Sequence, residues 1–268
     1  MIERFYQDMD SATLAAAQGL EAALAILPIA AIEAHGPHLP LGTDSIIAEH
    51  MLARAAATLP ADWPVTILPC LPVGLSPEHA AFAGTLSLSA ETALALLSGL
   101  SQDLRRSGFR RLLFLSSHGG NMPVLDLAAM AARQEGMLAT VANWQRFGLP
   151  AGLVPASESA YGIHGGAVET ALMLAFRPDL VRRAAIAHFP SLQTTLEGEA
   201  ELLRAHGRLG FAWAAQDLHP EGVVGDARLA DAAMGEAIAA HQVAGLTALA
   251  GDLLAFDLAR LRAGPPRP

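Results

Sequence analysis

The sequence contains a single cysteine, Cys70, among its 268 residues. One cysteine cannot form an internal disulfide, which fits a protein that works in a reducing compartment. Long basic runs are also missing, and the formal net charge is -9. Nucleic acid and anionic membrane surfaces are therefore excluded as expected partners.

Targeting and membrane-spanning signals are missing as well. The first ten residues, MIERFYQDMD, are charged and lack the apolar core of a signal peptide. The apolar run at 24–32, LAILPIAAI, contains Pro28 and is too short to cross a bilayer. These features predict a cytoplasmic protein. The Pro-rich end, RAGPPRP, predicts a frayed tail.

Signatures of several common enzyme classes are also missing. The sequence has no G-x-S-x-G nucleophile elbow, no P-loop and no G-x-G-x-x-G turn after a strand. Ser117 and His118 are neighbours at the end of a predicted strand, so they face opposite sides and do not form a nucleophile–base pair. Cys70 lies among apolar residues and prolines, which is typical of a buried, inert thiol.

Apolar residues make up 52% of the chain, which is enough for a sizeable core. Buried-strand patterns alternate with helical patterns, and Ser45, Ser89 and Gly108 are expected to cap or stop helices. The expected strands are 23–32, 65–73, 110–117 and 138–144, and the expected helices are 45–59, 89–108, 123–136, 165–176 and 227–250. This alternation predicts an α/β fold with a mostly parallel central sheet and helices on both faces, in one domain over 1–268.

Side chains that commonly bind metals gather where these strands are expected to end. Sites in parallel α/β sheets form at the carboxyl ends of the strands. Glu33 and His35 lie two residues apart at the end of the first strand, so both can face one ion. Other candidates follow the strand at 110–117 or begin the helix at 165–176. The complete candidate set is Glu33, His35, Asp44, His118, His164 and Glu169.

The mixture of imidazole and carboxylate groups favours a transition-metal site. Zn²⁺, Mn²⁺ and Fe²⁺ accept nitrogen and oxygen ligands together, whereas Ca²⁺ prefers oxygen alone. The set exceeds what one catalytic zinc ion needs, and a shared carboxylate is common where two ions lie about 3.5–4 Å apart. His38 could hydrogen-bond to a ligand carboxylate without binding a metal ion itself. Five further histidines are interpreted as ordinary core or surface residues: His50, His188, His206, His219 and His241.

Ordered sequence blocks over most of the chain resemble the creatininase family of metal-dependent amidohydrolases. The first, PIAAIEAHGPHLPLGTD, is similar to the family's Glu-x-His-Gly-x-His-Leu-Pro run followed by an aspartate. The others are GLSPEHAAFAGTLSLS at 74–89, SSHGGN at 116–121, HGGAVETALML at 164–174 and EGVVGDARLADAAMGE at 221–236.

The resemblance implies a three-layer α/β/α sandwich, a dinuclear zinc or manganese centre, with Fe²⁺ as an alternative, and a homo-oligomer, often a hexamer. It implies that Asp44 bridges the two ions and that His164 transfers protons. It further implies that Ser76 and the backbone around Gly119 contact the substrate. The implied ligands are Glu33, His35, Asp44, His118 and Glu169, and His38 and His79 are expected to support them.

The chain departs from the family pattern near the expected substrate site. Ser116 and Ser117 replace Asn-Gly, and Gly120 stands where creatininase itself has an acidic residue. Creatininase uses tryptophans around its substrate; here Trp144 could match one, and Tyr161 takes the place of another. These departures predict a substrate pocket that differs from that of creatininase.

The resulting functional prediction is hydrolysis of a C–N amide bond in a small substrate by water activated at two metal ions. The shared blocks leave several alternatives open. They are a peptidase of the type that trims the mycofactocin precursor, a formamide deformylase, and a family member that binds metal without catalysis. The regions 145–163 and 190–220 are expected to decide among the substrates.

Overall fold

The computed structural model describes residues 2–262, and the expected fraying of the tail falls largely on 263–268, outside the described residues. The strands are β1 Leu24–Ile29, β2 Val65–Ile67, β3 Arg111–Ser116, β4 Leu138–Asn143, β5 His188–Phe189 and β6 Gly225–Asp226. The helices are α1 Ser11–Ala16, α2 Thr43–Thr58, α3 Ala90–Ser107, α4 Met122–Gln134, α5 Ala156–Tyr161, α6 Ala167–Phe176, α7 Leu192–Glu199, α8 Ala215–Leu218 and α9 Ala232–Ala255. Each strand and helix expected from the sequence has a counterpart, with shifted bounds.

The central sheet is parallel and has the strand order β2-β1-β3-β4. Ile29 of β1 lies beside Ser116 of β3, which in turn lies beside Asn143 of β4. The carboxyl ends of three strands are therefore level, and the residues that follow them are brought close together. β2 is an edge strand and ends before Pro69 and Pro72, as prolines there favour.

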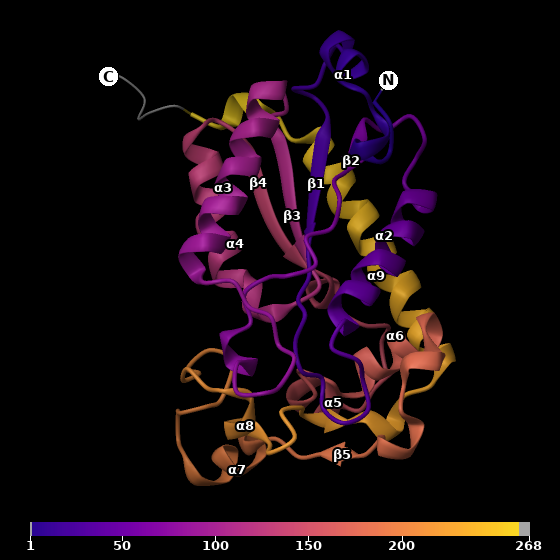
Figure 1. Cartoon of the computed structure of the whole chain (residues 1–268), viewed down its shortest axis with the longest axis vertical. Coiled ribbons are helices and arrows are strands. Elements are labelled where there is room, and N and C mark those ends of the chain that lie inside the picture. Colours follow the sequence, from indigo (N-terminus) through magenta and orange to yellow (C-terminus); the bar gives the residue numbers. More distant parts are fainter. Residues whose placement is uncertain (1, 263–268) are drawn as a thin grey trace.

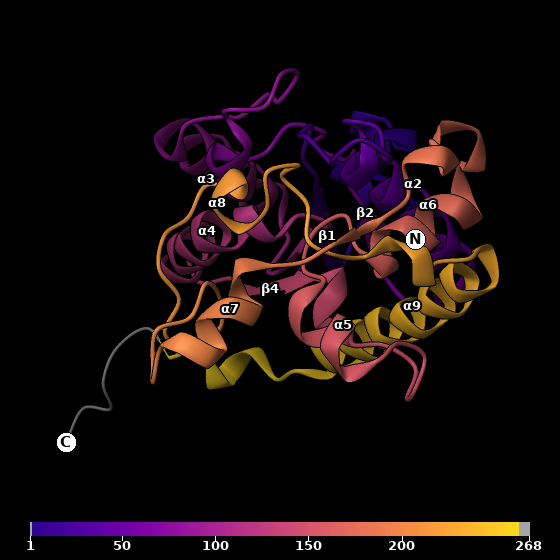
Figure 2. The ribbon, with the colours of Figure 1, turned by 90° about the horizontal axis from the view of Figure 1, so that it is seen from below.

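The side chains of β1 alternate between two layers of helices. Leu24 and Ile26 belong to a core with α2, α6 and α9, whereas Ala25 and Leu27 belong to a core with α3 and α4. Figures 1 and 2 show α2 and α9 on one side of the sheet and α3 and α4 on the other. The prediction of a three-layer α/β/α sandwich around a mostly parallel sheet is thus confirmed.

Helix α9 is long and apolar enough, by length and composition alone, to cross a membrane. In the structure it packs against α2 and α6, and Ile238, Val243 and Leu246 are buried in their shared core. These side chains form part of the core of this helical layer, as an apolar face of a core helix does.

The start of α2 differs from the prediction that Ser45 caps it. The helix begins at Thr43 with Gly42 as N-cap, so Ser45 lies inside its first turn. The Ser45 hydroxyl lies within hydrogen-bond distance of the carbonyls of Ala31 (3.3 Å) and Pro72 (3.2 Å). The serine thus connects the helix to the loops that follow β1 and β2. By contrast, Ser89 caps α3 as predicted, by accepting from the backbone N–H of Thr92.

Two glycines of α3 allow a matched test of the helix. Gly99 lies inside α3 with nothing within 4 Å of the place that a methyl group would take, whereas Gly108 ends the helix with a φ of 113°. Gly99→Ala is expected to raise the free energy of unfolding by about 0.5–1 kcal/mol, since alanine favours the helix. Gly108→Ala is expected to lower it by about 1 kcal/mol or more, because a side chain is strained there. Denaturant unfolding would measure both free energies. A change of the same sign in both variants would contradict the placement of Gly99 inside the helix and of Gly108 at its end.

Candidate metal centre

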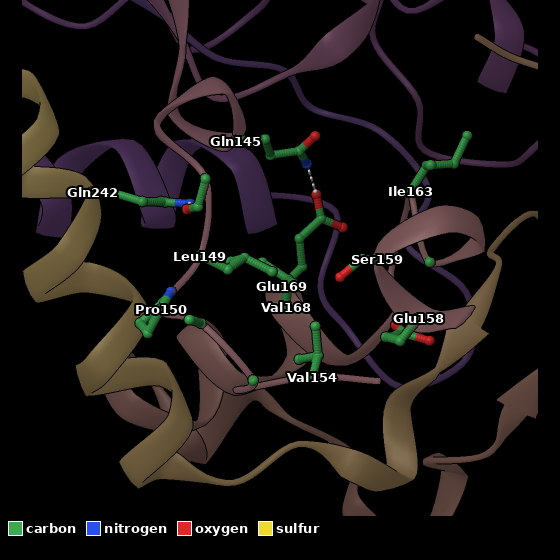
Figure 3. Close-up of a pocket in the computed structure, with 14 residues that line it drawn as sticks. Gln145, Leu149, Pro150, Val154, Glu158, Ser159, Ile163, Val168, Glu169 and Gln242 are labelled. Atoms are coloured by element: carbon green, nitrogen blue, oxygen red, sulfur yellow. Dashed lines mark hydrogen bonds between the residues drawn. The ribbon is translucent and has the colours of Figure 1, made fainter. Parts of the chain in front are cut away.

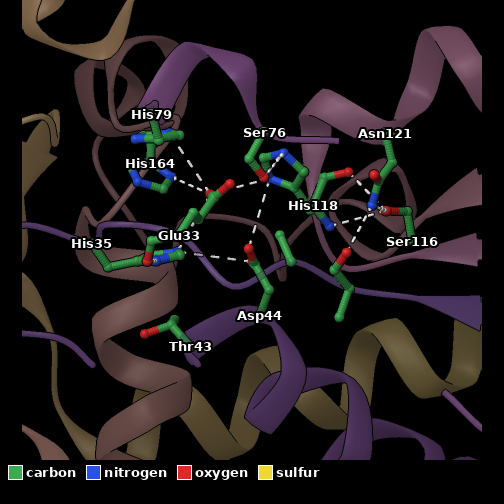
Figure 4. Close-up of polar contacts among 12 residues, drawn as sticks. Glu33, His35, Thr43, Asp44, Ser76, His79, Ser116, His118, Asn121 and His164 are labelled. Atoms are coloured by element: carbon green, nitrogen blue, oxygen red, sulfur yellow. Dashed lines mark hydrogen bonds and ion pairs between the residues drawn. The ribbon is translucent and has the colours of Figure 1, made fainter. Parts of the chain in front are cut away.

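The predicted ligands converge beyond the carboxyl ends of β1 and β3. The loop after β1 supplies two of them, α2 and α6 each supply one from their first turn, and one directly follows β3. They are Glu33 (0% exposed), His35 (1%), Asp44 (1%), His118 (5%) and Glu169 (7%). Figure 4 shows the side chains of the first four pointing toward one another.

His35 directs one ring nitrogen at three carboxylates. Its Nδ1 lies 3.1 Å from the backbone carbonyl of Glu33. Because a carbonyl only accepts, Nδ1 carries the hydrogen and Nε2 keeps its lone pair. This Nε2 lies 3.8 Å from Asp44 Oδ1 and 3.9 Å from both Glu33 Oε1 and Glu169 Oε2. These separations exceed hydrogen bonds but suit ligands grouped around one ion.

His118 forms a second group on the other side of Asp44. Its Nδ1 lies 3.1 Å from Glu33 Oε1 and 3.7 Å from Asp44 Oδ2. Asp44 therefore directs one oxygen toward His35 and the other toward His118. A carboxylate placed in this way between two histidines has the arrangement that a bridge between two ions requires.

Burial and the neighbouring charges shift the pKa of every group in the cluster. Burial, reinforced by the Glu33 carboxylate, raises the pKa of Asp44 well above its ordinary value, and burial also raises the pKa of Glu169. Burial would raise the pKa of Glu33 too, but the His118 imidazole beside it holds that pKa well below its usual range. Burial would lower the pKa of His118, yet Glu33 raises it well above 6.5, whereas burial dominates at His35 and lowers its pKa.

The residues present fit a pair of divalent cations. Within 2–262, Glu33 Oε2, His35 Nε2 and Asp44 Oδ2 are buried and make no hydrogen bond. Unpaired polar atoms at this depth cost free energy, which a cation would offset by binding all three. Carboxylate oxygen combined with imidazole nitrogen is also the donor set of zinc, manganese and iron. The assignment of these residues as ligands stays a prediction that this geometry supports.

His164 lies at the edge of the cluster, next to solvent. Its Nε2 is 2.9 Å from the carbonyl of Ala34, so this nitrogen donates. Its Nδ1 then has a lone pair and lies 3.5 Å from Glu33 Oε1. The predicted role in proton transfer is compatible with this position, although His164 is also close enough to Glu33 and His79 to join a metal-binding group.

The two histidines predicted to support the ligands lie in different surroundings. His79 is buried, and its Nε2 is 3.7 Å from Glu33 Oε1. His38 lies farther back, where its Nε2 is 3.0 Å from both the carbonyl of Gly165 and the hydroxyl of Thr170. His38 therefore holds the turn before α6 rather than a ligand carboxylate directly.

Three residues predicted to contact substrate do not line the two cavities beside the cluster. Ser76 is fully buried, with its hydroxyl 3.2 Å from His118 Nε2, so it faces the histidine instead of the substrate space. Trp144 is 3% exposed because it packs in the core beside Phe147. Tyr161 donates its hydroxyl to a Glu197 carboxylate oxygen at 2.6 Å. Contact of these three residues with substrate stays a prediction.

Glu78 is a charged residue that the sequence analysis left without a role. It follows Pro77 in the short 3-10 helix Pro77–His79, and its Oε1 lies 3.3 Å from His118 Nε2. The signal available in the sequence was its position directly before His79 in the GLSPEH block. That signal was too weak to separate Glu78 from an ordinary loop glutamate.

Two cavities adjoin the cluster. A cavity of about 600 Å³ lies over it and is lined by His118, Gly119, His164 and Glu169 among others. A second cavity of about 440 Å³, drawn in Figure 3, is also lined by Glu169. Gln145, Ile163 and Glu169 line both cavities, so the two meet at a predicted ligand. Gly119, predicted to contact substrate through its backbone, is in the wall of the larger one.

Residues 7–250 match the sequence model of the family described as creatinine amidohydrolase. The chain belongs to the creatininase family. This membership confirms the resemblance seen in the ordered sequence blocks. It also places the buried cluster in a family of hydrolases.

Curated relatives in the creatininase family include two kinds of enzyme. The mycofactocin precursor peptide peptidase of Mycolicibacterium smegmatis is 32% identical over 227 residues, covering 83% of this chain and 82% of that protein. The creatinine amidohydrolase of Pseudomonas putida is 30% identical over 173 residues, covering 58% of this chain and 65% of that protein. This creatininase-family chain is accordingly a hydrolase of carbon–nitrogen bonds.

Solved structures of creatininases share the fold. A crystal structure of creatinine amidohydrolase superposes with a TM-score of 0.75 at 23% identity, covering 96% of this chain and 100% of that one. The agreement extends over the sheet and both helical layers. At this identity the likeness concerns the fold alone.

Metal binding by the creatininase-family chain is expected to weaken as the pH falls, because protons compete with metal ions for the ligands. Asp44, Glu169 and His118 have raised pKa values, so they keep protons to higher pH than usual and an ion must displace those protons. The apparent affinity should therefore rise with pH. Titration of the metal-free protein against a chromophoric chelator at several pH values would measure it, and a pH-independent affinity would contradict the ligand assignment.

Proposed function

We propose that this creatininase-family hydrolase cleaves an amide bond within a peptide, with two divalent metal ions at the candidate centre. The observation that carries the proposal is the pair of cavities that meet at Glu169. Each lies in the size range of ordinary ligand pockets, about 300–1,000 Å³. A compact ring needs one pocket, whereas a chain that extends on both sides of its scissile bond needs two.

The walls of both cavities suit peptide side chains. Leu75, Pro77, Phe211 and Trp213 line the larger cavity together with the polar groups of the cluster. The smaller cavity has an apolar wall of its own, drawn in Figure 3, which includes Leu149, Pro150, Val154 and Val168. Apolar walls around a few fixed polar groups favour a ligand with apolar side chains and a polar backbone.

The relatives support the same choice. The Mycolicibacterium smegmatis protein, which is named for a peptide substrate, is similar to this chain over more than four fifths of its length. The named creatinine amidohydrolase of Pseudomonas putida matches 58% of this chain. A peptide substrate is therefore favoured over creatinine.

We propose that the two ions are zinc, manganese or both, with iron as the alternative. Creatininases have been solved in a manganese form and in a Zn–Zn form, and the oxygen–nitrogen donor set here suits these metals. His35 with Glu169 would hold one ion, and His118 would hold the other. Glu33 and Asp44 lie between the two histidines and would serve both ions.

When bound, the ions supply an activated water as nucleophile and polarise the substrate carbonyl. His164 presents Nδ1 toward the cluster, because its Nε2 is held by the carbonyl of Ala34. This nitrogen can accept a proton from the attacking water and return it to the leaving nitrogen. Gly119 leaves the wall beside His118 open, since nothing lies within 4 Å of the place a methyl group would take, and its backbone is available to the substrate.

A cytoplasmic location and a homo-oligomeric assembly, a hexamer by resemblance, complete the proposal. The single cysteine supports the location, and the family resemblance supports the assembly. Light scattering on the purified chain would measure the number of subunits.

The substrate proposal is tested with metal-reconstituted protein against short peptides, formamides and creatinine. Peptides with apolar residues on both sides of the scissile bond are expected to be the best substrates, because they fill both cavities. Leu149→Trp, which narrows only the second cavity, should lower kcat/KM for such peptides by about tenfold or more. Preference for a formamide or creatinine would overturn the peptide proposal, and no turnover of any amide would favour a non-catalytic role.

The proton-transfer role predicts that His164→Ala binds two ions as the wild type does and loses turnover by about 10²–10⁴-fold. Metal analysis and steady-state kinetics on the same preparation would measure both quantities. His188→Ala is a suitable control, since that histidine is exposed in β5 and lines neither of the two cavities. Loss of an ion in His164→Ala would show instead that His164 is a ligand.

A further inference from the structure

The environment of His118 is asymmetric between its two ring nitrogens. Nδ1 faces Glu33 and Asp44, the carboxylates proposed to bind metal. Nε2 faces away from them and lies 3.0 Å from the carbonyl of Leu75. Since a carbonyl only accepts, Nε2 carries a hydrogen, and Nδ1 is the nitrogen that remains for a metal ion.

Three acceptors surround this Nε2, and one of them is charged. Besides the Leu75 carbonyl, the Ser76 hydroxyl lies at 3.2 Å and Glu78 Oε1 at 3.3 Å. The Glu78 side chain is 15% exposed, so water screens it only in part. A carboxylate is a stronger acceptor than a carbonyl or a hydroxyl, and it increases the electron density that an imidazole offers from its opposite nitrogen.

The segment that bears Glu78 is tied to the central sheet. The backbone N–H of Leu75 donates to the Asn121 side-chain oxygen at 2.8 Å. The amide nitrogen of Asn121 in turn donates to the carbonyl of Ala30 (3.0 Å) and the hydroxyl of Ser116 (3.2 Å). The last residue of the SSHGGN block thus fixes the approach of the Glu78 segment to the ends of β1 and β3.

The absence of a side chain at Gly120 leaves room for the contact between Glu78 and His118. A Cβ built at Gly120 would collide with His118 Nε2 and Glu78 Oε1, and would lie 2.8 Å from the carbonyl oxygen of Leu75. A side chain at position 120 would therefore prevent the observed contact between Glu78 and His118. The glycine that departs from the creatininase pattern is required by the position of Glu78.

We propose that Glu78 is a positioning residue that orients His118 for metal binding by accepting from its Nε2–H. The inference rests on the proposed metal centre and adds a residue outside its ligand set. Partners of this kind typically change metal affinity by about 10–100-fold when removed. Glu78 lies against His118, so its effect is expected mainly on the ion that His118 would hold.

The test compares Glu78→Ala, Glu78→Gln and the wild type in the full-length chain. Zn²⁺ affinity is measured by competition with a chromophoric chelator, and Co²⁺ binding is followed by visible absorption as a report on ligand geometry. Glu78→Ala is expected to weaken one of the two ions by about 10–100-fold and to change the Co²⁺ spectrum. Glu78→Gln keeps an acceptor oxygen but loses the charge, so its affinity should lie between those of Glu78→Ala and the wild type. Glu91→Ala, which removes an exposed glutamate from the start of α3, is the control.

Each outcome of this test decides the proposal. Unchanged affinity and spectrum in Glu78→Ala would overturn it, and equal losses in Glu78→Gln and Glu78→Ala would show a direct ligand instead. An equal weakening of both ions, with a lower melting temperature of the metal-free variant, would show a general structural role. If the wild type bound no ion, the proposed metal centre itself would be wrong. If the protein hydrolysed peptides but the Glu78 variants bound metal as the wild type does, the proposed function would stand and only this inference would be overturned.

Discussion

The structure is organised around the burial of the Glu33 and Asp44 carboxylates side by side. Two like charges at this depth repel each other strongly unless cations or protons compensate them. Within residues 2–262, the ion pairs of Glu33 are all with histidines. Asp44 and Glu169 each lie in the first turn of a helix, where the backbone N–H groups favour negative charge. The fold therefore arranges these groups so that they could hold a divalent cation.

Close packing of two turns holds the histidines beside these carboxylates. Gly36 follows His35, Gly165 follows His164, and both glycines adopt a positive φ. A Cβ would lie 2.6 Å from a Val223 methyl carbon at Gly36, and 2.5 Å from one at Gly165. The two turns, which are far apart in the sequence, thus pack against the same valine. This contact gives the EGVVGDAR segment, which the sequence analysis used only as a block resembling the family, a structural reason for its place in the family pattern.

Much of the fold and the position of the site could be predicted because both follow from local rules. Short apolar runs such as 110–117 have the length of a buried strand, and Ser89 and Gly108 mark the ends of α3 by their own backbone chemistry. Grouping Glu33 with His118 needed only the rule that parallel strands end at one edge. The contacts of Ser76, Trp144 and Tyr161 depend on which segments pack over them, and sequence similarity carries no such information.

The chemistry and the choice of substrate therefore come from different parts of the molecule. The cluster is built from strand ends and helix starts, where a small displacement would change every distance between ligands. The cavity walls are built from the loop after β4 and from the segment between α7 and α8, which include Leu149 and Trp213. Loops of this kind can change without disturbing the sheet. Related chains named for a peptide and for creatinine share this family, so the substrate has to be inferred from the cavities rather than from the ligand motif.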